Sequence, residues 1–142
     1  MTGRFADFDE DRFVDRVGHT SLPELMSLIA GANLVVASDT GIVHMAFALG
    51  RPSVAVVGGG LPQRYHPYPA DTLPAEEDQD ARPAIVTSAM DCFGCGWHCT
   101  HPVVPNRPAP CIEQIAIEPV LDQILARLAI TTRIGACHDT AA

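Results

Sequence analysis

A group of small polar residues follows an apolar run in the first half of the chain. The group comprises Ser38, Asp39, Thr40 and Gly41, with His44 following one helical turn later. The apolar residues 34–37 before it predict a buried strand, and the small and apolar residues after it predict a helix. At such a junction in an open α/β sheet, the first N–H groups of the helix point outward, and phosphates bind there readily. The spacing therefore predicts a phosphate-binding turn.

Each member of this turn has a role that suits its chemistry. The hydroxyl groups of Ser38 and Thr40 either cap the helix or donate to a phosphate oxygen, and Gly41 lets the backbone approach a ligand. His44 lies on the same helix face as Thr40 and is placed to donate to a diphosphate. Asp39 repels phosphate, so it either caps the helix or accepts from a sugar hydroxyl. The alternative is an ordinary helix cap at Asp39 or Thr40, with His44 as a partly buried side chain.

A second group of residues suited to ligand binding lies further along the chain. Its members are Cys92, Cys95, Cys99 and Cys111, spaced C-x2-C-x3-C-x11-C. Four thiolates at this spacing predict a closed tetrahedral knuckle for a structural metal ion, and soft sulfur ligands select zinc or iron without separating the two. His98 and His101 are possible substitutes for one sulfur, whereas Cys137 lies outside the pattern. The alternatives are a redox pair, buried free thiols or disulfides.

Apolar periodicity and start and stop signals predict the elements that position these groups. A helix begins after Ser21, which forms a capping box with Glu24, and it ends at Gly31. Strands are predicted over residues 34–37, 53–57 and 84–90, helices over 41–49 and 117–129, and a short strand over 12–19. The last helix carries its apolar residues on one stripe: Ile117, Val120, Leu121, Ile124, Leu125 and Leu128. The pattern predicts a Rossmann-like α/β fold, in which flanking helices cover a parallel sheet, together with the Cys-rich metal knuckle.

The composition of the 142-residue chain narrows the class of protein. The net charge is −8 and all nine basic residues are Arg, which disfavours a nucleic-acid partner. No apolar run approaches the ~20 residues of a membrane span, and the acidic start has no hydrophobic signal core. We therefore expect a cytoplasmic protein, in which cysteines serve as metal ligands or free thiols. Three parts are expected: an acidic segment (1–17), the Rossmann-like domain with the knuckle at 92–111 (18–130), and a tail (131–142).

Three linked motifs of the chain resemble those of one family of glycosyltransferases. They consist of Gly18, Thr20, Ser21, Leu22, Glu24 and Leu25; then Asp39, Thr40, Gly41 and His44; then Ala48, Leu49, Gly50 and Pro52. With these motifs in order, the chain is similar, from about residue 18 to residue 128, to the C-terminal half of the heptosyltransferase-like glycosyltransferases of family 9. The resemblance implies the C-terminal Rossmann-like domain of a two-domain GT-B glycosyltransferase.

The resemblance also implies ligands and a reaction. The family binds a nucleotide-sugar donor, usually ADP-heptose, for transfer to a lipopolysaccharide or protein acceptor. The implied diphosphate and sugar contacts are Asp39, Thr40, Gly41 and His44, with Ser38 beside them. In the family, the acceptor site and the catalytic base belong to an N-terminal domain that has no counterpart here. We therefore assign no catalytic residue and expect the chain alone to be inactive, with an open sheet edge that pairs with a separate acceptor-binding domain or a second copy.

Two further expectations come from the same resemblance. Gly58–Gly60 is expected to form a ligand-facing turn, after which Arg64 or His66 reaches a phosphate. The cysteine run is similar to an iron-binding finger of heptosyltransferases that modify autotransporters, which implies a structural role.

Two other kinds of function remain open: a non-catalytic, metal-stabilised interaction module, and another Rossmann-like enzyme. The latter would be a nucleotide-sugar epimerase or a redox protein that uses Cys92 and Cys95.

Overall fold

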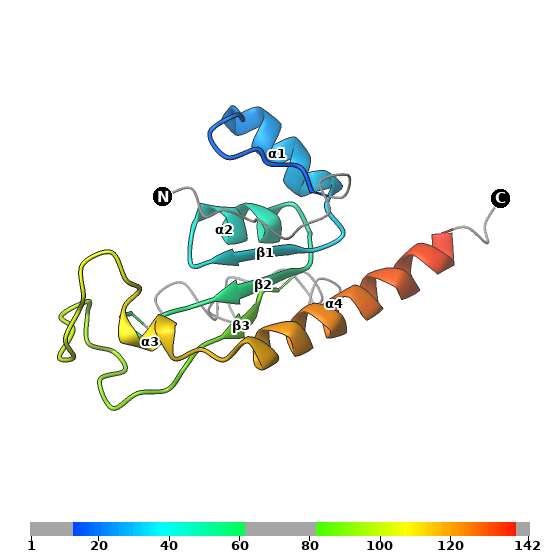
Figure 1. Cartoon of the computed structure of the whole chain (residues 1–142). Helices are drawn as coiled ribbons and strands as arrows, with labels where there is room; N and C mark the ends of the chain where they lie inside the picture. Colours follow the sequence, from blue (N-terminus) through cyan, green and yellow to red (C-terminus); the bar gives the residue numbers. More distant parts are fainter. Residues whose placement is uncertain (1–12, 62–81, 139–142) are drawn as a thin grey trace.

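The computed structural model describes residues 13–61 and 82–138, and at its centre lies a three-stranded parallel sheet (Figure 1). The strands are β1 (Val35–Ser38), β2 (Ser53–Val56) and β3 (Ala84–Val86). They lie in the order β1-β2-β3, and Val35 of β1 is opposite Ser53 of β2. The predicted parallel sheet is therefore confirmed for the described residues. The third strand is shorter than predicted, because its pairing with β2 ends at Val86.

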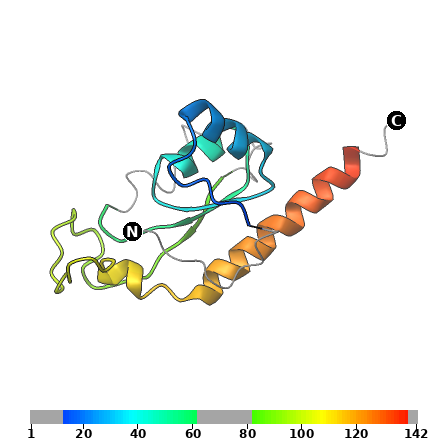
Figure 2. The ribbon, with the colours of Figure 1, turned by 45° about the horizontal axis from the view of Figure 1, so that its top comes forward.

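Helices cover both faces of this sheet (Figures 1 and 2). On one face lies α2 (Gly41–Ala48), on which α1 (Leu22–Gly31) packs, and on the other lies α4 (Ile117–His138). The short helix α3 (Pro110–Glu113) lies beyond the end of the sheet (Figure 1). Neighbouring side chains of a strand point to opposite faces of a sheet. Ala55 of β2 accordingly shares an apolar cluster with Val43 of α2. Val54 of β2 shares another cluster with Val120 and Ile124 of α4, so the sheet forms a middle layer between helices.

The start of α1 agrees with the sequence. The Glu24 carboxylate accepts hydrogen bonds from the N–H and the hydroxyl of Ser21, at 2.8 and 2.6 Å. The predicted capping box is therefore confirmed. The short strand predicted over residues 12–19 is wrong for the described part of that range. There the chain forms a turn, in which the His19 N–H donates to the Arg16 carbonyl oxygen at 3.0 Å.

The last helix is longer than predicted and packs along a narrower face. It runs on to His138, so that residues 131–138, predicted as part of a tail, are helical. No proline follows Pro119 in the chain to interrupt it. Only part of the predicted apolar stripe packs on the sheet, through Val120 and Ile124. The exposed members of the stripe are Ile117, Leu121, Leu125 and Leu128.

No helix within the described residues is long and apolar enough to cross a membrane.

The core is built from small aliphatic side chains around one buried hydroxyl group. Val43, Val54 and Ala55 are fully buried, and so is Ser53. The Ser53 Oγ atom has no hydrogen-bond partner. Burying a polar group without a partner costs about 1–3 kcal/mol. The packing around β2 is therefore stable enough to tolerate this penalty.

Candidate functional site

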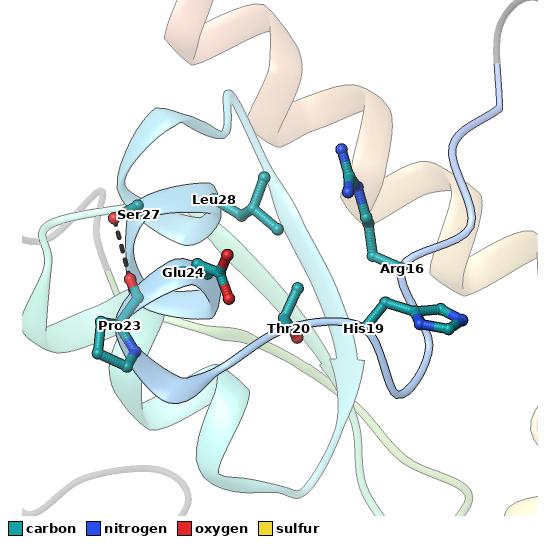
Figure 3. A pocket seen from close by; sticks show the side chains of 7 residues that line it. All are labelled: Arg16, His19, Thr20, Pro23, Glu24, Ser27 and Leu28. Atoms are coloured by element: carbon teal, nitrogen blue, oxygen red, sulfur yellow. Dashed lines mark hydrogen bonds between the residues drawn. The ribbon is translucent and has the colours of Figure 1, made fainter.

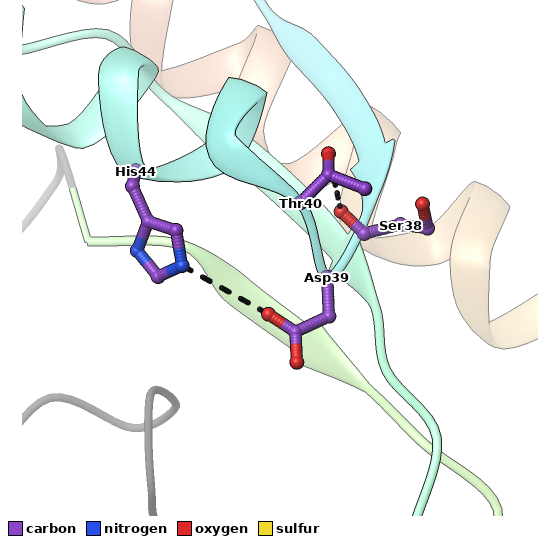
Figure 4. Close-up of polar contacts among 4 residues, drawn as sticks. All are labelled: Ser38, Asp39, Thr40 and His44. Atoms are coloured by element: carbon purple, nitrogen blue, oxygen red, sulfur yellow. Dashed lines mark hydrogen bonds and ion pairs between the residues drawn. The ribbon is translucent and has the colours of Figure 1, made fainter.

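The predicted phosphate-binding turn lies where β1 meets α2 (Figure 4). Ser38 is the last residue of β1, Thr40 is the N-cap of α2, and Gly41 is its first residue. The Thr40 hydroxyl donates to the Ser38 carbonyl oxygen at 3.3 Å and makes no capping hydrogen bond to α2. All three residues are exposed. The outward N–H groups of the first helical turn are therefore not satisfied by the Thr40 side chain, which is the arrangement that an anion requires.

The two ionisable side chains of this turn face one another. Figure 4 shows Asp39 and His44 reaching toward a common point beside the start of α2. The Asp39 Oδ1 atom lies 3.9 Å from the His44 Nε2 atom, and the two side chains are 25% and 35% exposed. A carboxylate at this distance attracts a protonated imidazole and so orients the ring. The structure thus brings all five predicted residues together at the carboxyl end of β1, and both ionisable groups keep solvent-accessible surface.

The three glycines after β2 are buried, contrary to the ligand-facing turn predicted for Gly58–Gly60. A methyl group on Gly59 would lie 2.7 Å from the Phe93 ring. A methyl group on Gly60 would lie 2.5 Å from the Trp97 ring. Both aromatic side chains belong to residues 91–111, which we term the Cys segment. The prediction is wrong because this segment packs directly onto the glycine backbone.

Backbone hydrogen bonds hold the two chain segments together. The Gly94 N–H donates to the Gly59 carbonyl oxygen at 2.7 Å, and the Gly96 N–H donates to the Gly60 carbonyl oxygen at 2.8 Å. The Cys segment is therefore attached to the end of the central strand. The predicted phosphate contacts Arg64 and His66 lie outside the described residues.

The Cys segment encloses a small cavity lined by all four predicted metal ligands. These are Cys92, Cys95, Cys99 and Cys111, and none of them is in a disulfide. The other lining residues are Gly59, Met90, Phe93, His101 and Pro110. The cavity volume is about 10 Å³, which corresponds to one water-sized occupant. Free sulfur atoms around so small a volume, in an otherwise mostly apolar wall, fit one closed metal site.

Asp91 also belongs to this cluster, although the sequence analysis did not single it out. The possible ligand atoms of Asp91, Cys92 and His101 all lie within 4.8 Å of one another. The His101 Nε2 atom is 3.1 Å from the Asp91 Oδ1 atom. The only signal for Asp91 in the sequence is its place directly before a predicted ligand. Of the two histidines considered as substitutes for a sulfur, His101 lines the cavity and His98 does not.

A larger, open cavity of about 430 Å³ lies beside the first turns of α1 (Figure 3). Its lining residues are Arg16, His19, Thr20, Pro23, Glu24, Ser27 and Leu28. The hydrogen bond from the Ser21 hydroxyl, with that from the Ser21 N–H, lowers the pKa of the Glu24 carboxyl below its ordinary value. The Ser27 hydroxyl donates a hydrogen bond to the Pro23 carbonyl oxygen at 2.9 Å (Figure 3). No ligand was predicted for this cavity, although it carries an arginine and a histidine from the preceding loop.

Comparisons with known proteins bear on the turn at β1 rather than on the Cys segment. The family model of "Glycosyltransferase family 9 (heptosyltransferase)" matches residues 4–86, which is more than half of the chain. The Cys segment lies beyond the matched residues. No solved structure gives a significant match to the chain.

Curated relatives match over shorter stretches. The chain is 42% identical over 50 residues to lipooligosaccharide heptosyltransferase 2 of Haemophilus influenzae. This stretch is 35% of the chain and 14% of the relative. The chain is 41% identical over 46 residues to lipopolysaccharide heptosyltransferase 1 of Salmonella typhimurium, covering 32% of the chain and 14% of the relative. The chain is 42% identical over 45 residues to lipopolysaccharide heptosyltransferase 2 of Escherichia coli. This stretch is 32% of the chain and 13% of the relative. The match thus spans about a seventh of each relative.

The family match extends across α1, β1, α2, β2 and β3, and it includes the whole turn from Ser38 to His44. The order of motifs in the sequence and the parallel sheet that carries them agree with this match. The chain belongs to glycosyltransferase family 9, the heptosyltransferase family.

Proposed function

We propose that the chain is the donor-binding part of a glycosyltransferase and that it binds a nucleotide sugar of the ADP-heptose class. Membership of family 9 and the names of the matched relatives support this class of reaction. The observation that carries the proposal is the open N-terminus of α2. There, Ser38, Thr40 and Gly41 are exposed, His44 is partly exposed, and the Thr40 side chain does not cap the helix N–H groups.

In this proposal the donor diphosphate lies against the first turn of α2. The backbone N–H groups of Gly41 and Ile42 and the Ser38 hydroxyl donate to its oxygens, and His44 donates from the side. The Thr40 hydroxyl joins them only when it turns away from the Ser38 carbonyl oxygen to which it donates in the free chain. The Asp39 carboxylate holds the imidazole and accepts from a hydroxyl of the donor sugar. These roles use the positive end of the helix dipole and keep the one negative side chain away from the phosphates.

The proposed reaction places these residues on the leaving group. An acceptor hydroxyl, on a lipopolysaccharide or a protein, attacks the anomeric carbon of the sugar, and the bond from that carbon to the diphosphate oxygen breaks. The bond electrons leave with the nucleoside diphosphate, whose growing negative charge is stabilised by the start of α2 and by His44. The proton of the acceptor hydroxyl passes to a base on a separate acceptor-binding domain, because we assign no base to the described residues.

We also propose that the Cys segment holds a structural zinc or iron ion, bound by donors that line its cavity. The free thiols and the size of the cavity support this site. When bound, the ion would crosslink parts of the segment that are far apart in sequence. A cavity this small leaves no room for a substrate beside the ion, so the proposed role is structural.

The second candidate is a metal-stabilised module that binds a partner and transfers no sugar. The position of the cysteine cavity beyond the family match favours this candidate. A redox enzyme that uses Cys92 and Cys95 is a third candidate, and it requires that the two thiols cycle to a disulfide without bound metal.

Calorimetric titration with ADP and ADP-heptose separates the first two candidates. We expect saturable binding by the wild-type chain. The His44→Ala variant should bind roughly tenfold to a hundredfold more weakly, because one hydrogen bond to a charged group is lost. The matched control is His19→Ala, which removes an imidazole from the open cavity beside α1 and should leave the affinity unchanged.

Two outcomes would contradict the assignment. Binding that persists in His44→Ala and disappears in His19→Ala would place the nucleotide beside α1. A wild-type chain that binds neither nucleotide would favour the interaction module.

A further inference from the structure

The cavity in the Cys segment has one more potential ligand than a tetrahedral ion uses. Four cysteines line it, and His101 lines it as well. A structural zinc site takes four ligands, drawn from thiolate sulfur and imidazole nitrogen. One of the five side chains must therefore remain outside the coordination shell. Their exposure and spacing in the structure indicate which one.

Cys99 is the outlier among the four thiols. It is exposed, whereas Cys92, Cys95 and Cys111 are partly buried. His101 is also partly buried, with a side chain that is 33% exposed. A closed structural site is built from the less exposed donors, because each ligand must be screened from competing water.

The spacing of the donors also favours His101 as a member of the shell. One of its two ring nitrogens lies within 4.8 Å of the Cys92 sulfur. Two ligand atoms of a tetrahedral zinc ion lie about 3.6 Å apart, so the imidazole ring and this sulfur are close enough to share an ion after the two side chains adjust. No group of three sulfurs comes so close together among the described residues.

Asp91 supplies an independent sign that His101 is a ligand. The His101 Nε2 atom lies 3.1 Å from the Asp91 carboxylate, and that carboxylate is otherwise 85% exposed. Metal-binding histidines characteristically donate their second ring N–H to a carboxylate, which fixes the tautomer and leaves the other nitrogen free to bind. An N–H donated from Nε2 leaves the Nδ1 lone pair as the ligand.

We infer that the metal ligands are Cys92, Cys95, Cys111 and His101 Nδ1, that Asp91 is a positioning residue for the imidazole, and that Cys99 remains a free thiol. This inference rests on the proposed structural metal site and is independent of the proposed nucleotide site. Three thiolates around a divalent ion give the centre a formal charge of −1, in place of −2 for four. The lower charge suits a site with a carboxylate beside it.

The first test uses the wild-type chain loaded with zinc and treated with a thiol-alkylating reagent. Peptide mapping should show Cys99 modified in the metal-bound protein and Cys92, Cys95 and Cys111 modified only after chelation. Protection of all four thiols by the metal would overturn the inference. This test needs no variant, so a failure to fold cannot imitate the result.

The second test compares matched pairs of variants loaded with Co²⁺. The intensity of the sulfur-to-cobalt absorption band reports the number of Co–S bonds. Cys99→Ser should keep the band and a 1:1 metal content, whereas Cys111→Ser should lose both. His98→Ala should match the wild type, whereas His101→Ala should lose affinity and Asp91→Asn should bind roughly tenfold to a hundredfold more weakly.

The opposite pattern, in which Cys99→Ser loses the ion and His101→Ala keeps it, would establish four sulfur ligands and overturn the inference. Circular dichroism of each variant shows whether the helices are intact. A wild-type chain that binds no metal would overturn the inference and the structural metal together. Nucleotide titration of the same sample tests the donor site separately, so the two failures are distinguishable.

Discussion

Replacing Gly60 by alanine tests whether the Cys segment is held on the sheet by close packing against bare backbone. A β-carbon at this position would lie 2.5 Å from the Trp97 ring, which is too close for any real contact. The Trp97 ring has to move, because the new β-carbon is attached directly to the backbone. Trp97 is 59% exposed, so a path into solvent is open to it.

The cost follows from the surface that the ring now covers. Of the roughly 250 Å² that a buried tryptophan removes from water, about two-fifths, or ~100 Å², is covered here. At ~25 cal/mol per Å², the loss is about 2.5 kcal/mol. A ring that stays in place costs a similar ~1–3 kcal/mol in strain. Alanine returns ~0.4–1 kcal/mol by restricting the unfolded chain. We therefore expect Gly60→Ala to destabilise the protein by about 1–2 kcal/mol.

Fluorescence gives a direct assay, because Trp97 is the only tryptophan in the chain. Gly60→Ala should shift its emission to longer wavelength in the folded protein and lower the free energy of unfolding in urea. Gly31→Ala is the matched control, since a methyl group there meets no atom within 4 Å. That variant should leave the emission unchanged and leave stability equal or slightly higher. Unaltered emission and stability in Gly60→Ala would refute the packing of Trp97 on the glycine.

Three other predictions concern the core, the acid side of the stability profile and the metal. Ser53→Ala removes a buried hydroxyl that has no hydrogen-bond partner, so urea unfolding should show a gain of about 1–3 kcal/mol; a loss of stability would mean that the hydroxyl is satisfied in solution. The hydrogen bonds from Ser21 lower the Glu24 pKa below its ordinary 4.5 in the folded protein. Their contribution is therefore complete above about pH 4.5 and is lost as the pH falls through the folded-state pKa. Thermal unfolding of Glu24→Gln should accordingly show a flatter pH profile below 4.5, and a profile parallel to the wild type would contradict this assignment. Chelation of the bound metal should shift the Trp97 emission in the direction expected for Gly60→Ala, and unchanged emission would argue against a structural role.

The elements that follow from local sequence were predictable. The capping box of Ser21 and Glu24 sets the start of α1 within four residues, and apolar runs mark the strands. The turn at β1 was equally accessible, because a strand end and a helix start are neighbours in sequence. Its residues come together through the connectivity of one strand–helix junction, without any distant contact.

The surroundings of the central strand were not predictable in this way. Gly58–Gly60 was expected to face a ligand, but Phe93 and Trp97 cover it from more than 30 residues away in the sequence. A run of glycines accommodates a close ligand and a close aromatic ring equally well, so the sequence pattern alone does not distinguish them. The sequence also underestimated the length of α4. Residues 131–138 have no clear apolar periodicity, yet the helix continues through them.

The position of the Cys segment links the two proposed sites through the sheet. The turn proposed to bind the donor follows β1, the glycines that carry the segment follow β2, and these two strands are hydrogen-bonded neighbours with parallel direction. Both features therefore lie at the carboxyl end of the sheet, where ligands of open α/β folds bind. The buried side chains beneath them are mostly valine and alanine, each of which contributes little apolar area. If a metal crosslinks it, a segment fixed on the end of β2 would supply rigidity that this core does not. The proposed structural metal would therefore lie beside the proposed substrate-binding turn because of strand order, and this placement requires no role for the ion in sugar transfer.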